Sequence, residues 1–175
     1  MSHEQKFHPM VKLMHGLVAI AMIAAIVIIL IAGEMPRGPE KFELYFWHKS
    51  LGVLVGGLVL FRIWAVVSKG KPKPLGKGIA RLAAQWGHRL LYVAMILMPV
   101  SGFLMSWSGG RETPFFGLFT IPGASEKLEW LNEITHEVHE IAGNVVIGLI
   151  VLHVLGALYH HFIVKDKTLS RMFGR

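Results

Sequence analysis

The chain of 175 residues contains no cysteine. Disulfide bonds, iron–sulfur clusters, thiolate metal sites and thioether-attached haem, which needs C-x-x-C-H, are therefore excluded. Charge is also scarce: 17% of the residues are charged, against about 25% in an average soluble domain. The hydrophobic share is 53%, and the mean hydropathy is +0.51. Because a soluble domain of this length cannot bury so much apolar surface, and a disordered chain would not carry it, the composition indicates an integral membrane protein.

Four apolar segments account for this composition, at about residues 11–32, 45–67, 85–107 and 138–164. Each is long enough to cross about 30 Å of hydrocarbon as a helix. The backbone must satisfy its own hydrogen bonds there, so helices are the expected structure. We expect the first segment to be retained, because its apolar run is too long for a signal peptide. The length allows one domain, so the prediction is an all-α, integral membrane four-helix bundle spanning residues 1–175.

The charged residues indicate how the bundle is oriented. The 68–84 connection is basic and has no acid, and both chain ends are basic too, whereas the 108–137 connection holds five glutamates. The positive-inside rule then places both termini and the 68–84 connection in the cytoplasm. Arg62 and Arg89 lie near the cytoplasmic ends of their spans and are expected to snorkel to the interface. This basic charge suits anionic lipid rather than nucleic acid. Residues 124–137 are expected to form a short surface helix that leads into the last span.

Histidine is abundant, with ten copies, and ionisable residues inside a membrane mark functional sites. His139 and His153 are fourteen residues apart, about 40° short of four helical turns, so they share a face and are separated by about 21 Å. Two such ligands on one helix can each serve a separate haem. His48 opens the second span from the same side as His139, so these two can face each other. For His153 the partner is His15 or His88, and geometry alone leaves both open.

Other readings of these residues remain at this point. The histidines could serve helix packing or a proton relay. Gly52, Gly143 and Gly156 each lie on the face of a nearby histidine, where a missing side chain would let a flat porphyrin approach. The alternative for these glycines is close helix packing, since Gly52-x-x-x-Gly56 is also a small-residue contact motif.

Several sequence stretches resemble the bacterial cytochrome b561 family of small, four-helix, two-haem membrane proteins. They are MHG with His15, WHKSLG with His48, QWGHRLLY with His88, VHEIAGNVVIGLIVLH, and the C-terminal GALYHHFIVKDKTLSRM. The resemblance implies haem ligation by His15, His48, His139 and His153, and so a pairing of His15 with His153. It also implies two non-covalent haem b groups, a place in the bacterial inner membrane and electron exchange with ubiquinone.

One branch of that family oxidises superoxide outside the membrane and reduces ubiquinone, which is the function expected here. The outer connections are net acidic, which disfavours steering of an anion, but Lys49, Arg37 and Arg111 are local cations. Alternative functions are an electron-relay or anchor subunit for a partner dehydrogenase or hydrogenase, and a haem-free histidine-lined transporter.

The candidate quinone-binding residues are His160 and His88. His160 follows His153 by seven residues, about 20° short of two turns, and so shares its face. A histidine can hydrogen-bond a quinone carbonyl and deliver a proton. Trp64 and Trp86 could flank the ring, and contact with lipid phosphates is the alternative role.

Overall fold

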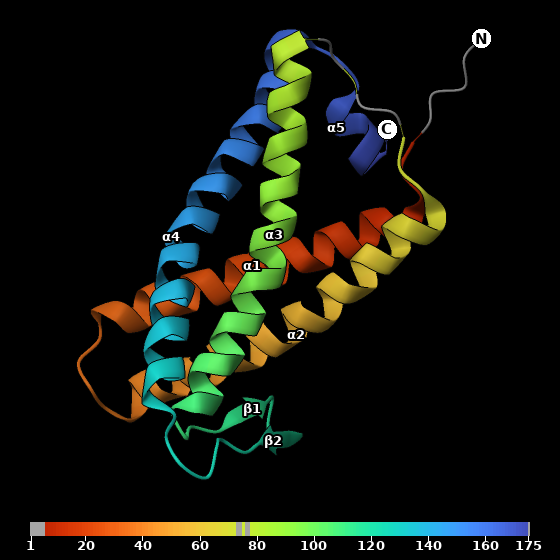
Figure 1. Ribbon diagram of the computed structural model, residues 1–175. Coiled ribbons are helices and arrows are strands. Elements are labelled where there is room, and N and C mark those ends of the chain that lie inside the picture. The colour runs from red at the N-terminus through yellow and green to blue at the C-terminus, as the bar shows by residue number, and fades with distance from the viewer. Residues whose placement is uncertain (1–5, 73–74, 76–77, 175) are drawn as a thin grey trace.

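Four long helices dominate the computed structural model of the chain (Figure 1), which describes residues 6–72, 75 and 78–174. They are α1 (Pro9–Glu34), α2 (Pro39–Lys69), α3 (Gly78–Ser108) and α4 (Glu129–Tyr159). Each is long and apolar enough to cross a membrane, α4 together with the π-helical turn η1 (His160–Val164) that continues it. The prediction of a helical membrane bundle is therefore confirmed. Lys73 and Lys77 of the basic connection lie outside the described residues.

The helices extend beyond the predicted spans, because hydropathy marks only the part of a helix that lies in hydrocarbon. Pro39 at the first turn of α2 starts that helix six residues before the predicted 45. α4 starts at Glu129 instead of 138. The helix expected over 124–137 begins at Glu129 and continues without a break into the last span as the first part of α4, whereas residues 124–128 are not helical.

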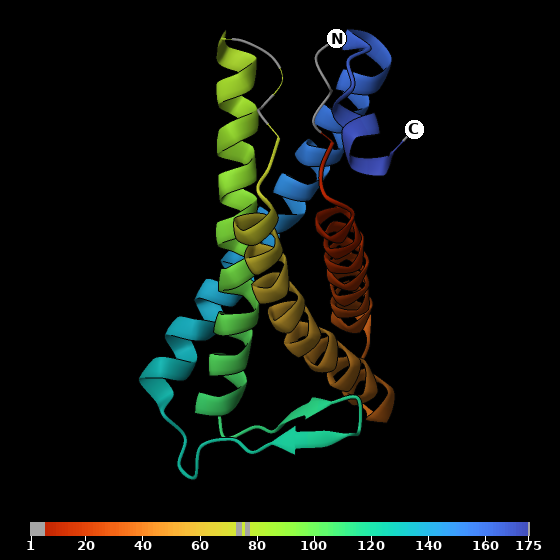
Figure 2. The same cartoon turned by 90° about the vertical axis from the view of Figure 1, so that its right-hand side faces the viewer.

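The helices pack as two antiparallel hairpins, α1 with α2 and α3 with α4, joined where α2 packs on α3. Two views at right angles show that the hairpins cross rather than run parallel (Figures 1 and 2). Both chain ends and the α2–α3 connection lie at one end of the molecule, hereafter the termini end. There the Phe7 N–H donates to the carbonyl of Arg171, 3.4 Å away, beside the short helix α5 (Thr168–Phe173). The basic segments recognised in the sequence are thus gathered at one end.

A small apolar core lies midway along the bundle. It consists of buried residues from all four long helices: Val18, Ala21, Met22, Val55, Val59, Ala94, Met95 and Val146. Along α4, Val146 is seven residues from His139 and seven from His153, about 10 Å in each direction. The core therefore separates two levels at which histidines occur.

The outer face of the bundle is apolar. Large side chains such as Ile20, Leu60 and Leu152 are about seven-tenths exposed at membrane depth. In water such a continuous apolar surface would be unfavourable, whereas in a bilayer it contacts lipid chains. The exterior therefore agrees with a multi-pass membrane protein.

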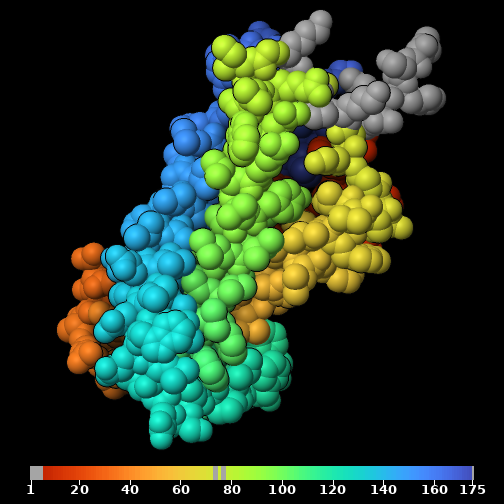
Figure 3. All heavy atoms as spheres, viewed as in Figure 1, coloured from red at the N-terminus to blue at the C-terminus, as the bar shows by residue number. Residues whose placement is uncertain are grey.

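The connection between α3 and α4 folds into a β-hairpin that the sequence analysis did not predict. β1 (Thr113–Phe115) pairs antiparallel with β2 (Phe119–Ile121). The turn uses positive φ angles at Phe116 and Gly117. The fully buried Ser50 of α2 anchors it: its hydroxyl donates to the Pro114 carbonyl and accepts from the Phe116 N–H. The hairpin covers the end of the molecule opposite the termini, hereafter the hairpin end (Figures 1 and 3).

Candidate functional site

The structure brings His48 and His139 together near the hairpin end. His48 comes from α2 and His139 from α4, and their ring centroids are 6.2 Å apart with the planes at 82°. Both side chains are partly buried. α2 belongs to the α1–α2 pair of helices and α4 to the α3–α4 pair. The two histidines therefore meet only because these two helix pairs cross.

Each ring of this pair is oriented through its Nδ1 atom. His48 Nδ1 lies 2.9 Å from the Ala25 carbonyl oxygen, which can only accept. His139 Nδ1 lies 3.0 Å from Ser101 Oγ, whose hydrogen is already donated to the Leu97 carbonyl. Nδ1 is therefore the donor in both rings. The neutral tautomer that results has an unprotonated Nε2, which is the form that binds a metal.

Gly102 provides the space in which the His139 ring lies. A Cβ atom at this position would be 2.8 Å from His139 Cε1 and 3.2 Å from Nδ1. Both distances are shorter than ordinary van der Waals contact, so any larger residue would displace the ring. The sequence signal for this role was the Ser-Gly pair two residues after Pro99, which the sequence analysis did not use.

Three histidines meet at the second level, nearer the termini end. The centroids of His15 and His153 are 6.2 Å apart with planes at 69°. His88 from α3 is closer to His153, at 5.4 Å. Both candidate partners of His153 are thus beside it, and only the His15 pair repeats the spacing found at the hairpin end.

Arg62 of α2 belongs to this second group. Its Nη1 donates to His15 Nδ1 over 2.7 Å, and its guanidinium lies 5.6 Å from the centre of the Tyr92 ring. The prediction that Arg62 snorkels to the interface is therefore wrong, because the side chain turns inward to His15. Arg89 is exposed and lies 4.9 Å over the Trp86 ring. The signal for Arg62 was its place inside the apolar run LVLFRIW.

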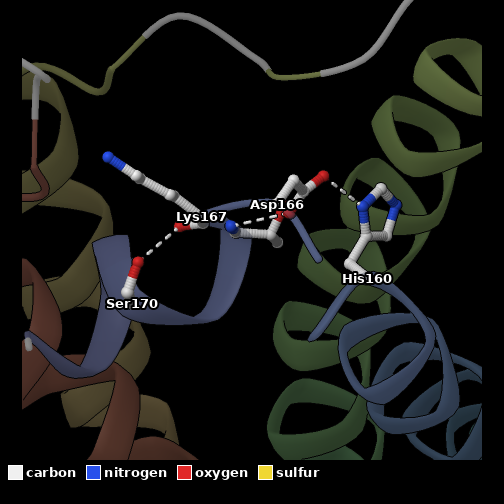
Figure 4. A network of polar contacts seen from close by, with 5 residues as sticks. His160, Asp166, Lys167 and Ser170 are labelled. Atoms are coloured by element: carbon white, nitrogen blue, oxygen red, sulfur yellow. Dashed lines mark hydrogen bonds and ion pairs between the residues drawn. The ribbon is translucent and has the colours of Figure 1, made fainter. Parts of the chain in front are cut away.

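His160 lies at the termini end, where α4 passes into η1. Its Nδ1 is 2.6 Å from Asp166 Oδ2, and the Thr168 N–H donates to Asp166 Oδ1 over 2.8 Å (Figure 4). Partial burial alone would raise the pKa of Asp166, but the hydrogen bonds from Thr168 and His160 outweigh it and hold the pKa below its usual value. Asp166 is thus a carboxylate that orients the His160 ring, a pairing the sequence analysis missed.

The glycines have different neighbours from one another. Gly56 packs on Pro99, with a Cβ position 3.4 Å from Pro99 Cβ, so the packing role applies there. Gly52 and Gly156 have no atom within 4 Å of a Cβ position, and Gly143 has only Met98 Cε at 3.8 Å. The close-packing alternative therefore fails at Gly52 and Gly156.

The cations expected near His48 are at the hairpin end. Lys49 Nζ donates to the Glu112 carbonyl over 2.6 Å, which ties α2 to the hairpin connection. Arg111 Nη2 donates to the Met105 carbonyl over 3.3 Å. Arg37 is exposed on the α1–α2 connection. Lys49 and Arg111 thus lie at the connection between α3 and α4, which Lys49 joins to the helix of His48.

Comparison with known proteins gives the family. The family model described as prokaryotic cytochrome b561 matches residues 6–175. The chain belongs to this family. The cytochrome b561 homolog 2 of Escherichia coli (strain K12) is 37% identical over 130 residues, which cover 73% of this chain and 69% of that protein. A Yersinia pestis protein named probable superoxide oxidase CybB is 30% identical over 167 residues, 92% of each chain.

Membership of the cytochrome b561 family implies haem b and electron transfer in a bacterial membrane. The cytochrome b561 homolog 1 of Escherichia coli (strain K12) is also similar, with 28% identity over 82% of each chain. The resemblance noted from the sequence motifs is therefore confirmed at the level of the family.

Proposed function

We propose that this chain is a two-haem cytochrome b of the bacterial inner membrane that transfers electrons from superoxide to ubiquinone. The observation that carries the proposal is that His48–His139 and His15–His153 have the same centroid separation, 6.2 Å, on either side of the apolar core. Metal–imidazole bonds of about 2.0 Å on both sides of one iron place ring centres about 6 Å apart. Both pairs fit that spacing, whereas His88–His153 at 5.4 Å is shorter.

The residues have distinct roles in this proposal. His48 and His139 hold one haem b through Nε2, with Ala25 and Ser101 fixing the rings through Nδ1. His15 and His153 hold the other. These four histidines would hold the haem b groups, which would supply one-electron redox chemistry.

The termini end is the proposed site of quinone reduction, and it faces the cytoplasm by the positive-inside rule. His160 Nδ1 donates to Asp166, which leaves Nε2 to exchange a proton with a quinone oxygen. Asp166 holds the ring in that orientation. His88 is less suited to this role because its ring lies against that of His153, with the centroids 5.4 Å apart.

The hairpin end is the proposed site of superoxide oxidation. Lys49 follows His48 directly and is bonded to the connection that carries Arg111, so a cation lies next to His48 and a second lies on the segment bonded to it. A local positive charge favours approach of an anion even where the surrounding connections are acidic. The similarity to the Yersinia pestis protein named probable superoxide oxidase supports this choice of donor.

A spectroscopic and kinetic experiment tests the proposal. The purified protein should carry about two haems per chain and show sharp reduced α-bands. A superoxide pulse in a stopped-flow instrument should reduce these haems faster than a sample that contains superoxide dismutase, and added ubiquinone should then reoxidise them. A colourless protein, even with haem supplied during expression, would refute haem binding. Equal reduction rates with and without dismutase would refute superoxide as the donor.

A further inference from the structure

Arg62 is a cation in the membrane-spanning part of α2, seven residues before the helix ends at Lys69. Its side chain is half-buried, and its neighbours in the chain are Phe61 and Ile63. The Nε atom is fully buried and has no hydrogen-bond partner among the described residues. One Nη atom contacts His15, and the guanidinium plane faces Tyr92.

The charge of Arg62 lacks an anion within the described part of the chain. The ion pairs found there are Lys127–Glu129, His136–Glu140 and His160–Asp166, none of which includes Arg62. A cation at membrane depth is costly unless an anion or several acceptors satisfy it. A neutral imidazole and an aromatic face satisfy it only in part, so the surroundings of Arg62 suit an additional anion.

The contact with His15 points the same way. A guanidinium can only donate, so His15 Nδ1 must accept and its hydrogen resides on Nε2. This is the opposite tautomer from His48 and His139. Iron binding through Nε2 of a neutral His15 requires the hydrogen on Nδ1, and two donors would then face each other across 2.7 Å. Arg62 Nη1 must therefore turn to another acceptor when His15 binds iron.

We propose that this acceptor is a propionate carboxylate of the haem held by His15 and His153, an inference that rests on the proposed function. Haem b carries two propionates, and a guanidinium binds a carboxylate through paired N–H donors, for which Nε and the Nη atoms are available. Arg62 is thus a positioning residue for the haem held by His15 and His153. Its positive charge beside the porphyrin also favours the reduced state, in which the haem carries one positive charge less, and so raises its midpoint potential.

The experiment compares three variants by redox titration and by infrared redox-difference spectra with propionate-labelled haem. Arg62→Gln removes the charge, Arg62→Lys keeps it, and Arg89→Gln removes an exposed arginine from the neighbouring helix. In Arg62→Gln we expect the midpoint potential of one haem to fall by about 59 mV, which is a roughly tenfold shift of its one-electron equilibrium toward the oxidised form. We also expect the infrared band of the propionate carboxylate of that haem to move. We expect a smaller shift in Arg62→Lys and none in Arg89→Gln.

The outcomes separate this inference from the proposed function. A wild-type protein without haem would refute the proposed function itself. If Arg62→Gln keeps two haems with unchanged potentials and carboxylate bands, the role of Arg62 is overturned while the proposed function stands. The same conclusion holds if such a variant shows only slower quinone reduction. If Arg62→Gln loses one haem, the Arg62→Lys variant decides between the alternatives. Two haems in Arg62→Lys with a displaced carboxylate band support the propionate contact. Two haems with an unchanged band overturn it.

Discussion

His139 Nδ1 and Ser101 Oγ lie 3.0 Å apart, and because Ser101 already donates its hydrogen to Leu97, the imidazole must donate to the serine. This one contact links the ring orientation on α4 to a side chain on α3. It fixes both the tautomer and the direction of Nε2. In the proposed function, the properties of the haem held by His48 and His139 depend on this contact.

Replacing Ser101 by alanine should weaken the proposed haem site of His48 and His139 without affecting the proposed site of His15 and His153. Loss of a hydrogen bond to a metal-binding histidine typically lowers affinity by about 10–100-fold. The measurement is the haem-to-protein ratio during haem titration, together with the two midpoint potentials. Ser106→Ala is the matched control, because Ser106 lies on the same helix and donates to Arg111 and Glu112 carbonyls instead. Equal haem affinity in Ser101→Ala and wild type would contradict the prediction.

Gly102→Ala should displace the His139 ring, since the added Cβ would lie 2.8 Å from Cε1. Overpacking of this kind costs about 1–3 kcal/mol, and here the strain falls on a proposed ligand. We expect loss of one haem with the other retained, measured by the pyridine haemochrome assay. Gly57→Ala, which meets no atom within 4 Å, should keep both haems. Retention of two haems with unchanged potentials in Gly102→Ala would mean that the ring can move without consequence.

The two possible partners of His153 can be distinguished by single substitutions. His15→Ala should reduce the haem content from about two to about one per chain, because an iron with one axial imidazole is held less firmly. His88→Ala should leave two haems, since the 5.4 Å spacing to His153 is shorter than that of the other pairs. The reverse result, with haem lost in His88→Ala and kept in His15→Ala, would assign the ligand to His88.

The hydrogen bonds to Asp166 predict a pH dependence of the C-terminal segment. Since its folded pKa is below the ordinary value of 3.8, the carboxylate stabilises the folded segment fully above that value. The stabilisation is lost as the pH falls through the lower, folded pKa. Wild-type residues 160–174 should therefore become more open to hydrogen exchange below about pH 4. Asp166→Asn should show faster exchange already at neutral pH and little change on acidification; an acid response equal to that of wild type would exclude Asp166 as its cause.

Local sequence was enough to predict the four spans, since unbroken apolar runs of about 20 residues have few alternatives to a membrane helix. It also placed His139 and His153 on one face of α4, because helical periodicity is a local property. The basic segments at one end followed from charge alone. The β-hairpin was missed because its two three-residue strands depend on anchoring by Ser50, 64 residues before Pro114.

The amino-acid sequence by itself determined that this is a helical membrane protein with histidines at two depths. Only the tertiary structure decided which side chains meet those histidines. Packing within each pair of helices brings Ser101 and Gly102 to His139, Ala25 to His48 and Arg62 to His15. The crossing of the two pairs brings His48 to His139 and His15 to His153. These contacts join residues far apart in the chain, and no local pattern encodes the angle at which two pairs of apolar helices pack.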